Sequence, residues 1–333
     1  MDLENGKITN LMKFKLQPIS GDASFRKFYR LKSKTGSKII VYAEKDKYSN
    51  LLAYAAVNNF LRENKILAPK LYNHNYKKGI IIIEDFGDQS LHKVLLKKKN
   101  KLNTYKKIVN LLVEIQKIKP KPKIKDFNNQ LYSIKKYSKN YLHKETDLFL
   151  NWYLPIFLKK NKAKKVKKRI NFFLSTLYDK INLPNSCFVH RDYHVKNLIN
   201  VDKKIGVIDS QDALIGNPAY DLVSLIDDVR IKTSKKIKNK IYNYYLKKTN
   251  QIYKNNSEKF LNDFNILSVQ RSLKIIGIFS RLFKRDKKKR YLKLIPYTWK
   301  LLEMRMNSDI FYDLRTILSD NFKKKDRKKI LFK

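Results

Sequence analysis

Short apolar runs separated by turn residues occupy the first quarter of the chain. The runs at 27–33 (KFYRLKS) and 37–44 (SKIIVYAE) are rich in β-branched and aromatic residues and flank the turn signal Thr35-Gly36. Residues 68–76 and the continuous apolar run at 80–84 predict two further strands around a Lys-Gly turn, and the second has the pattern of a buried, central strand. This part of the chain is therefore predicted to be β-rich.

Helical spacing of apolar residues replaces this pattern elsewhere. It is present at 51–64, where Asn50 just before the segment is a suitable N-cap, and it dominates the later part of the chain. The stretches 102–118 and 152–178 show it most clearly, with the loop sequence KPKPK between them. Helices are predicted to resume from Tyr220 to the C-terminus.

A β-rich beginning and a mainly helical remainder predict an α+β fold with two unequal lobes. We place a small N-terminal lobe at residues 1–88, with a hinge near 84–88, and a larger C-terminal lobe at 89–333. A second short β-like region, 186–213, interrupts the helical part. No repeat of fixed period occurs.

The region 186–213 carries the most informative chemistry. Asp192 follows a His-Arg pair, Asn197 lies five positions further on, and Asp209 comes twelve positions after Asn197 at the end of the apolar run IGVID. This spacing matches the H-R-D-x-x-x-x-N catalytic loop and the metal-binding aspartate of protein-kinase-like phosphotransferases. A surface loop with scattered polar residues is the alternative, and the strand–loop–strand context disfavours it.

Each residue type in this pattern suits phosphoryl transfer. Asp192 can accept the proton of an attacking hydroxyl and direct the hydroxyl at the γ-phosphate. The carbonyl oxygen of Asn197 and the carboxylate of Asp209 are ligands that Mg²⁺ prefers. The sequence therefore predicts a kinase-type active site that uses ATP and Mg²⁺.

Composition excludes several other classes of protein. With 333 residues, 43% of them hydrophobic, the chain can bury a substantial core, and its 8 Gly and 8 Pro exclude collagen-like and Pro/Gly-rich disordered chains. A single cysteine, Cys187, excludes an intramolecular disulfide framework and a cysteine-rich zinc site, and suits a reducing compartment. No run of 18 apolar residues is present and the first 18 residues lack signal-peptide features, so we expect a cytoplasmic protein without a membrane span.

The chain is strongly positive. Its 75 Lys and Arg exceed its 29 Asp and Glu by 46, a balance that favours polyanions such as nucleic acid or acidic membranes. The lysines, however, are spread over most of the chain alongside many Ile, Asn and Tyr residues, and the basic runs lack an aromatic stacking motif. We therefore expect compositional bias and solvated surfaces, with nucleic acid as a disfavoured partner. Nothing in the pattern indicates an oligomeric state.

Motifs at several places in the chain resemble one enzyme superfamily. The stretches FVHRDYHVKNLI (188–199) and IGVIDSQDALIGNPAYDLVSLIDD (205–228) are similar to the aminoglycoside phosphotransferases, and within them Tyr193 and the blocks IDSQDA and PAYDLVSL resemble the N-acetylmuramate/N-acetylglucosamine kinases. The segments SGDASFRKFYRL (20–31) and QRSLKIIGIFSRLFKRDKKKRYL (270–292) agree with that subgroup. The resemblance runs from about residue 18 to about residue 300. It implies a bilobal protein-kinase-like fold and the ATP- and Mg²⁺-dependent phosphorylation of the anomeric hydroxyl of an amino sugar, in the recycling of peptidoglycan sugars.

The resemblance also assigns roles within the predicted lobes. Asp192 would be the catalytic base, and Asn197 and Asp209 would hold Mg²⁺. ATP would be bound by a small-residue loop, one basic residue and the hinge, a set that comprises Gly21, Ala23, Ser24, Arg30, Glu84 and Phe86. From the residues alone, the loop is equally an ordinary turn, and the hinge is equally a buried strand followed by a turn.

The chain departs from the protein-kinase pattern at two positions. Tyr42 and Ala43 stand where the phosphate-pairing lysine is expected, and the next helix has no glutamate before Glu63 near its end. The Lys–Glu pair is then absent, or it is rebuilt from other basic residues, with the candidates Arg26, Arg30, Lys38 and Lys45.

A further set of polar residues is predicted to contact the sugar: His194, Gln211, Asp212, Arg281 and Arg285. The two arginines could bind a carboxylate such as the lactyl group of N-acetylmuramate. Ordinary loop packing or surface helix charge is the alternative for each member of the set. His190 and Asp221 are expected to support the structure, the first by buttressing the loop and the second by capping a helix or bonding the loop backbone.

The favoured hypothesis is an ATP- and Mg²⁺-dependent kinase whose partner is a small-molecule amino sugar. Two alternatives stay open. A kinase of the same superfamily would act on an aminoglycoside, a choline-like molecule or another hydroxylated metabolite, although the positive chain disfavours a cationic substrate. A weakly catalytic nucleotide-binding protein would instead contact nucleic acid, and its binding would depend steeply on salt.

Overall fold

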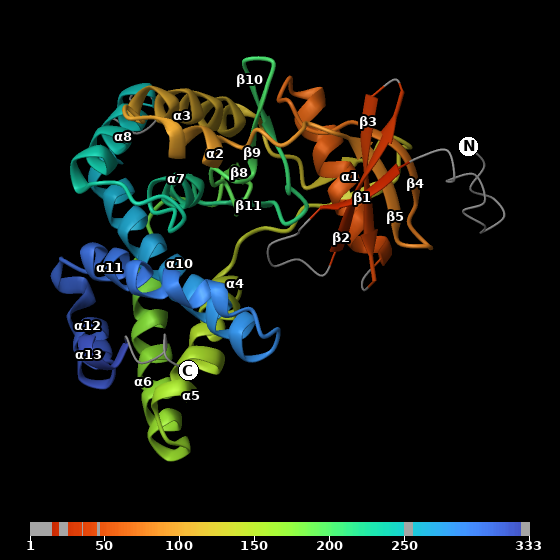
Figure 1. Cartoon of the computed structure of the whole chain (residues 1–333). Helices are drawn as coiled ribbons and strands as arrows, with labels where there is room; N and C mark the ends of the chain where they lie inside the picture. The colour runs from red at the N-terminus through yellow and green to blue at the C-terminus, as the bar shows by residue number, and fades with distance from the viewer. Residues whose placement is uncertain (1–14, 20–25, 35, 45–46, 250–255, 328–333) are drawn as a thin grey trace. The chain divides into compact units, whose positions relative to one another are not determined.

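The computed structural model describes residues 15–19, 26–34, 36–44, 47–249 and 256–327 (Figure 1). The chain divides into two compact units. The first is drawn from Met1–Lys101, Glu114–Lys135 and His190–Leu214, and the second from Leu102–Val113, Lys136–Val189 and Ile215–Lys333. The first unit thus joins the N-terminal strands to the segment that contains Asp192 and Asp209. The lobe boundary near 84–88 stays a prediction.

A five-stranded antiparallel sheet forms the core of the first unit. Its order is β1-β2-β3-β5-β4, built from β1 (Lys15–Ile19), β2 (Arg26–Ser33), β3 (Gly36–Ala43), β4 (Leu71–Asn75) and β5 (Ile80–Glu84). The strands predicted at 27–33 and 37–44 are confirmed to within one residue, and β5 coincides with the predicted apolar run. Because β5 lies between β3 and β4, its central residues Ile81, Ile82 and Ile83 are buried, as expected of an interior strand.

Helix α1 (Lys47–Glu63) packs against this sheet (Figure 1). Alternate residues of β3, among them Val41 and Ala43, share one hydrophobic cluster with Leu51 and Ala55 of the helix. Every residue from Leu51 to Asn58 is buried, so the sheet and the helix together form the hydrophobic core of the unit.

The prediction that Asn50 is the N-cap of this helix is wrong. The helix begins at Lys47, so Asn50 lies inside it. The ring of Tyr48 packs edge-on against that of Tyr76, with centroids 5.6 Å apart, and its hydroxyl donates to Gln130 at 3.0 Å. These tertiary contacts stabilise the extra residues at the start of the helix and override the local capping preference of asparagine.

Further elements of the first unit are α2 (Leu91–Lys97), the hairpin β6 (Lys123–Lys125) to β7 (Leu131–Ser133), and the hairpin β9 (Leu198–Val201) to β10 (Lys204–Val207). The second hairpin, with the short strands β8 (Cys187–Val189) and β11 (Leu214–Gly216), confirms the predicted β-like region. Two backbone bonds of 2.8 Å fix the hairpin within the unit, from Asn200 N–H to Gln89 and from Val207 N–H to Leu67.

The second unit is mainly helical, as predicted for this part of the chain. Its helices are α3 (Leu102–Lys117, whose last turn belongs to the first unit), α4 (Lys139–Leu148), α5 (Leu154–Phe157), α6 (Lys160–Asp179), α7 (Ala219–Ile226), α8 (Lys235–Lys248), α10 (Ser257–Lys284), α11 (Ile295–Arg305), α12 (Tyr312–Asn321) and α13 (Lys324–Arg327), with a π-helix η2 (Phe149–Tyr153) and 3₁₀ turns η4 (Lys289–Leu294) and η5 (Asp309–Phe311). The predicted helix at 102–118 is confirmed. The stretch 152–178 is helical but broken, because the chain is extended at Leu158 and Lys159.

Helix α10 lies at the centre of this unit and packs against α4, η2, α7 and α11. A Cβ at Gly277 would lie 2.2 Å from the carbonyl carbon of Leu148, so the close approach of α10 to η2 requires a glycine. Within the described residues, no helix has both the length and the apolar composition needed to cross a membrane.

A buried carboxylate ties three helices of the second unit together. Glu145 of α4 accepts hydrogen bonds from the hydroxyls of Tyr137 (2.6 Å) and Tyr220 (3.0 Å), from the amide of Gln270 (2.7 Å) and from the ammonium of Lys274 (2.7 Å). A buried charge is tolerated when it is paired and hydrogen-bonded in this way. Gln270 and Lys274 belong to the segment QRSLK, so these residues of the motif hold α10 against α4 and α7.

Candidate active site

The predicted catalytic residue Asp192 lies in a tight loop between β8 and β9. Its backbone carbonyl accepts the N–H of His194 at 2.9 Å and the side-chain Nδ2 of Asn197 at 3.1 Å. The N–H of Asn197 in turn donates to the carbonyl of His194 at 2.9 Å. Because the amide nitrogen of Asn197 is used inside the loop, its carbonyl oxygen is the side-chain atom that remains for a cation.

Asp209 is held beside this loop in an uncommon backbone conformation. The N–H of Ile208 donates to the carbonyl of Asn197 at 3.0 Å, and Asp209 itself has a φ of +63°. Arg191, just before Asp192, has a φ of +72°. Left-handed conformations of non-glycine residues are uncommon and gather at functional sites, where the surrounding structure enforces them.

His190 connects the loop to the strand that leads to Asp209. It is buried, and its Nε2–H donates to the carbonyl of Ile208 at 3.0 Å. Its ring lies edge-on to that of Tyr193, with centroids 6.2 Å apart. This geometry suits a supporting residue, and the role stays a prediction.

A buried arginine is the ionic partner of Asp209. Arg26, at the start of β2, places Nη2 3.0 Å from Oδ1 of Asp209, and its side chain is 5% exposed. Its guanidinium also lies over the ring of Tyr54, 5.8 Å from the centroid. Of the basic residues considered as a replacement for the phosphate-pairing lysine, Arg26 is the one that pairs with Asp209 in the described part of the chain.

The charges around Asp209 favour a bound cation. Burial raises the pKa of Asp209, Arg26 lowers it, and the carboxylates of Asp192 and Asp212 raise it again. A Mg²⁺ ion would relieve this repulsion, and the oxygen donors of Asn197 and Asp209 suit a hard cation. Across the residues that the structure describes, no group of three or more His, Cys, Asp or Glu could hold a metal, and Asn197 and Asp209 are the two oxygen donors predicted for a cation here.

Helix α1 is joined to the residue that follows Asp209. The hydroxyl of Ser210 donates to Oδ1 of Asn58 at 2.7 Å, and both residues are buried. One turn earlier, Tyr54 lies beside Asp209: burial raises the pKa of Tyr54 to about 12, the charge of Asp209 raises it too, and Arg26 lowers it. Sequence reasoning missed these contacts, although a polar Asn58 in an otherwise apolar, buried run of helix is a signal for one.

The segment 84–88, the predicted hinge, is organised by Arg30 of β2. Its Nε and Nη2 lie 2.5 and 3.1 Å from the carboxylate oxygens of Asp85, and its Nη1 and Nη2 lie 2.7 and 3.0 Å from those of Asp88. Ser37 and the N–H of Gly87 also donate to Asp85. The guanidinium is thus engaged within the hinge, and its contact with ATP stays a prediction.

Two other residues predicted to bind ATP, Glu84 and Phe86, lie at the end of β5 and just after it. The N–H of Glu84 donates to the carbonyl of Lys70 at 2.9 Å, so it is occupied within the sheet. The ring of Phe86 packs over Gly206 of β10, where a Cβ would come within 2.6 Å of the ring. The predicted loop residues Gly21, Ala23 and Ser24 lie outside the described residues.

The candidates for sugar contact divide between the two units. His194 and Gln211 are buried in the first unit, where Nε2 of Gln211 donates to the carboxylate of Asp212 at 2.8 Å. The side-chain carbonyl oxygen of Gln211 is buried without a hydrogen-bond partner among the described residues. Such an atom needs a donor, which a substrate N–H or O–H can supply.

Arg281 and Arg285 lie at the end of α10 in the second unit. Arg281 is half-buried; burial lowers its pKa, and its Nε has no hydrogen-bond partner within the described ranges. Arg285 is exposed and pairs with Asp286 at 2.7 Å. Sugar contact by either arginine stays a prediction.

Asp221 is buried in the first turn of α7. The N–H of Ala219, at the start of this helix, is bound by the side chain of Asn217 at 2.9 Å. The capping function is therefore carried by Asn217, and a supporting role of Asp221 through other contacts stays a prediction.

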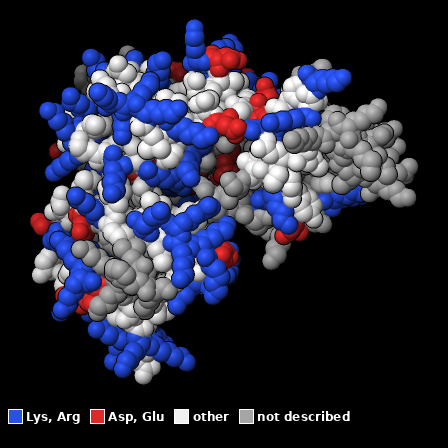
Figure 2. Space-filling view, in the orientation of Figure 1, with Lys and Arg blue, Asp and Glu red and all other residues white. Residues whose placement is uncertain are grey.

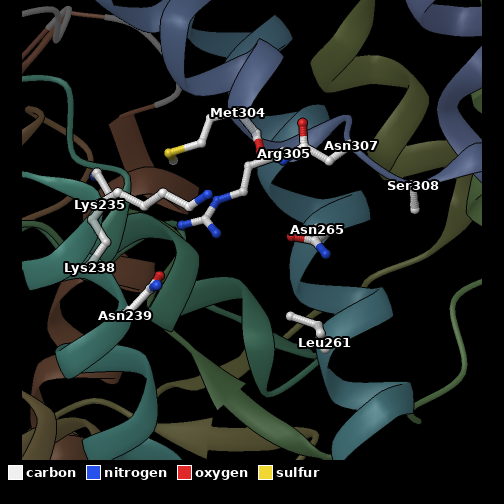
Figure 3. A pocket seen from close by; sticks show the side chains of 9 residues that line it. All are labelled: Lys235, Lys238, Asn239, Leu261, Asn265, Met304, Arg305, Asn307 and Ser308. Carbon is white, nitrogen blue, oxygen red and sulfur yellow. Dashed lines mark hydrogen bonds between the residues drawn. The ribbon is translucent and has the colours of Figure 1, made fainter.

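A pocket in the second unit contains none of the predicted site residues. It is lined by side chains from α8, α10, the end of α11 and the residues just after it (Figure 3), namely Lys235, Lys238, Asn239, Leu261, Asn265, Met304, Arg305, Asn307 and Ser308. The buried carboxylate of Asp227 pairs with Lys238 at 3.1 Å and with Arg305 at 2.9 Å. These ion pairs account for part of the basic lining, and the pocket does not mark the predicted active site.

Comparison with known proteins agrees with this geometry. The model of a phosphotransferase enzyme family, APH, matches residues 15–251, which is more than half of the chain. The chain belongs to this phosphotransferase family. It is 28% identical over 291 residues to an N-acetylmuramate/N-acetylglucosamine kinase of Pseudomonas aeruginosa, a match that covers 86% of this chain and 82% of the relative. An enzyme of the same name from Neisseria meningitidis serogroup B is 27% identical over 291 residues, with 85% and 83% covered.

Solved structures of other kinases share the fold of this phosphotransferase. An ethanolamine kinase of Plasmodium vivax has a TM-score of 0.62 and 16% identity, with 92% of this chain and 85% of that one covered. The aminoglycoside phosphotransferase APH(2'')-Ib bound to ADP has a TM-score of 0.57 and 17% identity, with 89% and 95% covered. At these identities the likeness concerns the fold, and it confirms the predicted α+β, protein-kinase-like architecture.

Proposed function

We propose that this phosphotransferase transfers the γ-phosphoryl group of ATP, with Mg²⁺, to the anomeric hydroxyl of an amino sugar of the N-acetylmuramate/N-acetylglucosamine class. The observation that carries the proposal is the loop in which hydrogen bonds of 2.9–3.1 Å hold Asp192 and Asn197 together and place them beside Asp209. The names of the two relatives at 27–28% identity support the choice of sugar. Such an enzyme would serve the recycling of cell-wall sugars.

Asp192 would act on the acceptor hydroxyl. Its carboxylate would orient the hydroxyl and take its proton as the acceptor oxygen bonds to the γ-phosphorus and the bond from that phosphorus to the leaving oxygen of ADP breaks. Phosphoryl transfer requires little covalent chemistry from the protein, so positioning of the reactants accounts for most of the catalysis. The hydrogen-bonded turn at 192–197 supplies that positioning for Asp192.

Asn197 and Asp209 would hold the Mg²⁺ ion through oxygen atoms. When bound, Mg²⁺ neutralises the charge of the nucleotide phosphates. Asp209 is oriented by its left-handed backbone and by Arg26, whose guanidinium lies 3.0 Å away and adds a second positive charge near the phosphates.

The nucleotide would bind within the first unit. The hinge would accept the adenine at the backbone near Phe86, and the loop that contains Gly21, Ala23 and Ser24 would cover the phosphates. APH(2'')-Ib, a phosphotransferase of similar fold, is bound to ADP, which supports a nucleotide as a ligand of this fold.

The sugar would be recognised by groups near Asp209. The unsatisfied carbonyl oxygen of Gln211 would accept the N–H of the acetamido group, which the relatives' sugars share. His194 and Asp212 would contact sugar hydroxyls.

The test is to incubate the full chain with ATP, Mg²⁺ and, separately, N-acetylmuramate, N-acetylglucosamine, kanamycin and choline, and to follow products by phosphorus NMR. An acid-labile sugar phosphate whose anomeric proton couples to phosphorus is the expected product. Asp192→Asn should lower kcat by about 10²–10⁴-fold with ADP binding retained, whereas Asp202→Asn, the same change in an exposed turn of the β9–β10 hairpin, should leave kcat unaltered. Transfer only to kanamycin or choline would overturn the choice of sugar.

A further inference from the structure

The side chains around Asp209 come from three separate parts of the first unit. Arg26 comes from β2, Tyr54 and Asn58 come from α1, and Ser210 is the next residue in the chain. Each of these four is at most 7% exposed. Buried polar side chains of this kind are stable only while they keep their hydrogen-bond partners. A shift of α1 would therefore change the position of Asp209.

The bond between Ser210 and Asn58 fixes the backbone directly after Asp209. It is 2.7 Å long and joins residues 152 positions apart. Asp209 has a φ of +63°, a conformation that persists only where neighbouring contacts enforce it. Without the bond, the backbone at 209–210 is expected to relax toward a commoner conformation and to turn the carboxylate away from Asn197.

Arg26 constrains the same carboxylate from the sheet side. Its Nη2 lies 3.0 Å from Oδ1 of Asp209, and its guanidinium is itself stacked on Tyr54 of α1. The orientation of Asp209 therefore depends on α1 twice, through Asn58 and through Tyr54.

We propose that Asn58 and Ser210 are positioning residues that set the affinity of Asp209 for its divalent cation. Protein kinases connect the corresponding helix to the nucleotide site through a Lys–Glu pair, and this chain has Tyr42 and Ala43 in place of that lysine and no glutamate in α1 before Glu63. Here the helix reaches the metal-binding segment through a neutral amide–hydroxyl bond. The inference rests on the proposed function only for the role of Asp209 as a metal ligand.

The test uses Mn²⁺ as a spectroscopic substitute for Mg²⁺ with the full chain, by electron paramagnetic resonance, with and without ADP. Mutation of a residue that orients a metal ligand typically lowers metal affinity by about 10–100-fold. Ser210→Ala should therefore weaken Mn²⁺ binding at least about 10-fold. ADP binding without metal should change less than about twofold. Saturating Mg²⁺ should restore kcat, a result that a merely structural defect would not give.

The matched control is Ser280→Ala. Ser280 is also fully buried, and its hydroxyl donates to the carbonyl of Ile276 at 2.8 Å, but it lies in α10 of the second unit. Its removal should leave Mn²⁺ affinity as in the parent. Asn58→Leu should act like Ser210→Ala, and the double variant should bind Mn²⁺ no more weakly than either single variant, because both remove one bond.

Three results would overturn the inference: parental Mn²⁺ affinity in Ser210→Ala, an equal loss in Ser280→Ala, or additive losses in the double variant. Since the titration contains no sugar, an enzyme that fails to phosphorylate amino sugars would still give a clear answer here. A parent chain that binds no Mn²⁺ with ADP would remove Asp209 from the metal site, and the inference with it.

Discussion

Arg30 shows how a single side chain can hold the segment 84–88, the predicted hinge. It pairs with Asp85, whose side chain is 3% exposed, and with Asp88, whose side chain is 62% exposed. Burial acts to raise the pKa of Asp85, but hydrogen bonds from Arg30, Ser37 and Gly87 outweigh it, so this pKa lies below its ordinary value. The buried pair is therefore the part of the hinge that is sensitive to mutation and to pH.

We expect Arg30→Met to lower the free energy of unfolding by about 3 kcal/mol at pH 7, because Asp85 would stay buried without its cation. A carboxyl whose folded pKa is lowered stabilises the fold above its unfolded pKa and loses that effect as the pH falls through the folded value. The difference between parent and variant should therefore shrink below about pH 4. Urea unfolding at pH 7 and at pH 3 measures both effects.

The control is Asp88→Asn, which removes the exposed carboxylate and should cost less than about 1 kcal/mol. An Arg30→Met loss as small as that of the control would show that the hinge does not depend on the buried pair.

The proximity of two site residues was predictable where they lie close together in the sequence. Asp192 and Asn197 share one short loop, so their spacing alone indicates that they meet. The sequence offered Arg26 only as one of four candidate replacements for the phosphate-pairing lysine, and its pairing with Asp209, 183 positions away, was not predicted. The bond between Asn58 and Ser210, which are 152 positions apart, was not predicted at all. No periodicity links such positions, and only the folded sheet and α1 place them together.

At the scale of elements, the hairpin β9–β10 and the end of β5 depend on one glycine. At Gly206 a Cβ would lie 2.6 and 2.7 Å from two ring carbons of Phe86 and 3.4 Å from Val201. Gly206→Ala should therefore displace the Phe86 ring and cost about 1–3 kcal/mol of unfolding free energy. If the backbone at Phe86 holds adenine, ADP affinity should fall in the same variant, as calorimetric titration would show.

Adding Phe86→Leu to Gly206→Ala should recover most of the lost stability, since the smaller side chain vacates the space that the new methyl group needs. Phe86→Leu alone is the reference. A double variant as unstable as Gly206→Ala would place the strain in the hairpin backbone instead.

The elements that the sequence predicted well are those whose own pattern decides them. The strand at 80–84 is apolar throughout and bounded by a turn, and the helix at 102–118 has a clear apolar face. The start of α1 was mispredicted, because contacts made by Tyr48 stabilise its first turn. The break between α5 and α6, where the backbone is extended at Leu158 and Lys159, was not predicted either. The requirement for a glycine at position 277 was not predictable either, since it comes from close contact with Leu148, in a different part of the chain.

At the scale of the whole molecule, the excess positive charge is spread over the face that one view displays. Figure 2 shows Lys and Arg side chains across the displayed face with few Asp and Glu among them. The basic run on α6 follows the same rule: Lys164, Lys165 and Lys168 are exposed on a helix whose buried face is apolar. This distribution is typical of solvated charge and differs from a single nucleic-acid-binding patch.

Diffuse charge makes a prediction about nucleic acid. A 20-base-pair duplex of arbitrary sequence should bind at 20 mM KCl through phosphate contacts, and the affinity should fall by about 10³-fold or more by 200 mM because counterion release weakens with salt. Replacing Lys164, Lys165 and Lys168 by Gln should lower the salt slope only in part, since many other lysines contribute. Fluorescence anisotropy across the salt series measures both. The rate of sugar phosphorylation at 200 mM should stay within about twofold of its low-salt value, because a contact pair with a buried member, such as Arg26 with Asp209, is screened less by salt than exposed lysines are. Binding that survives 200 mM KCl and prefers one sequence would instead identify a dedicated nucleic-acid surface and make the charge functional.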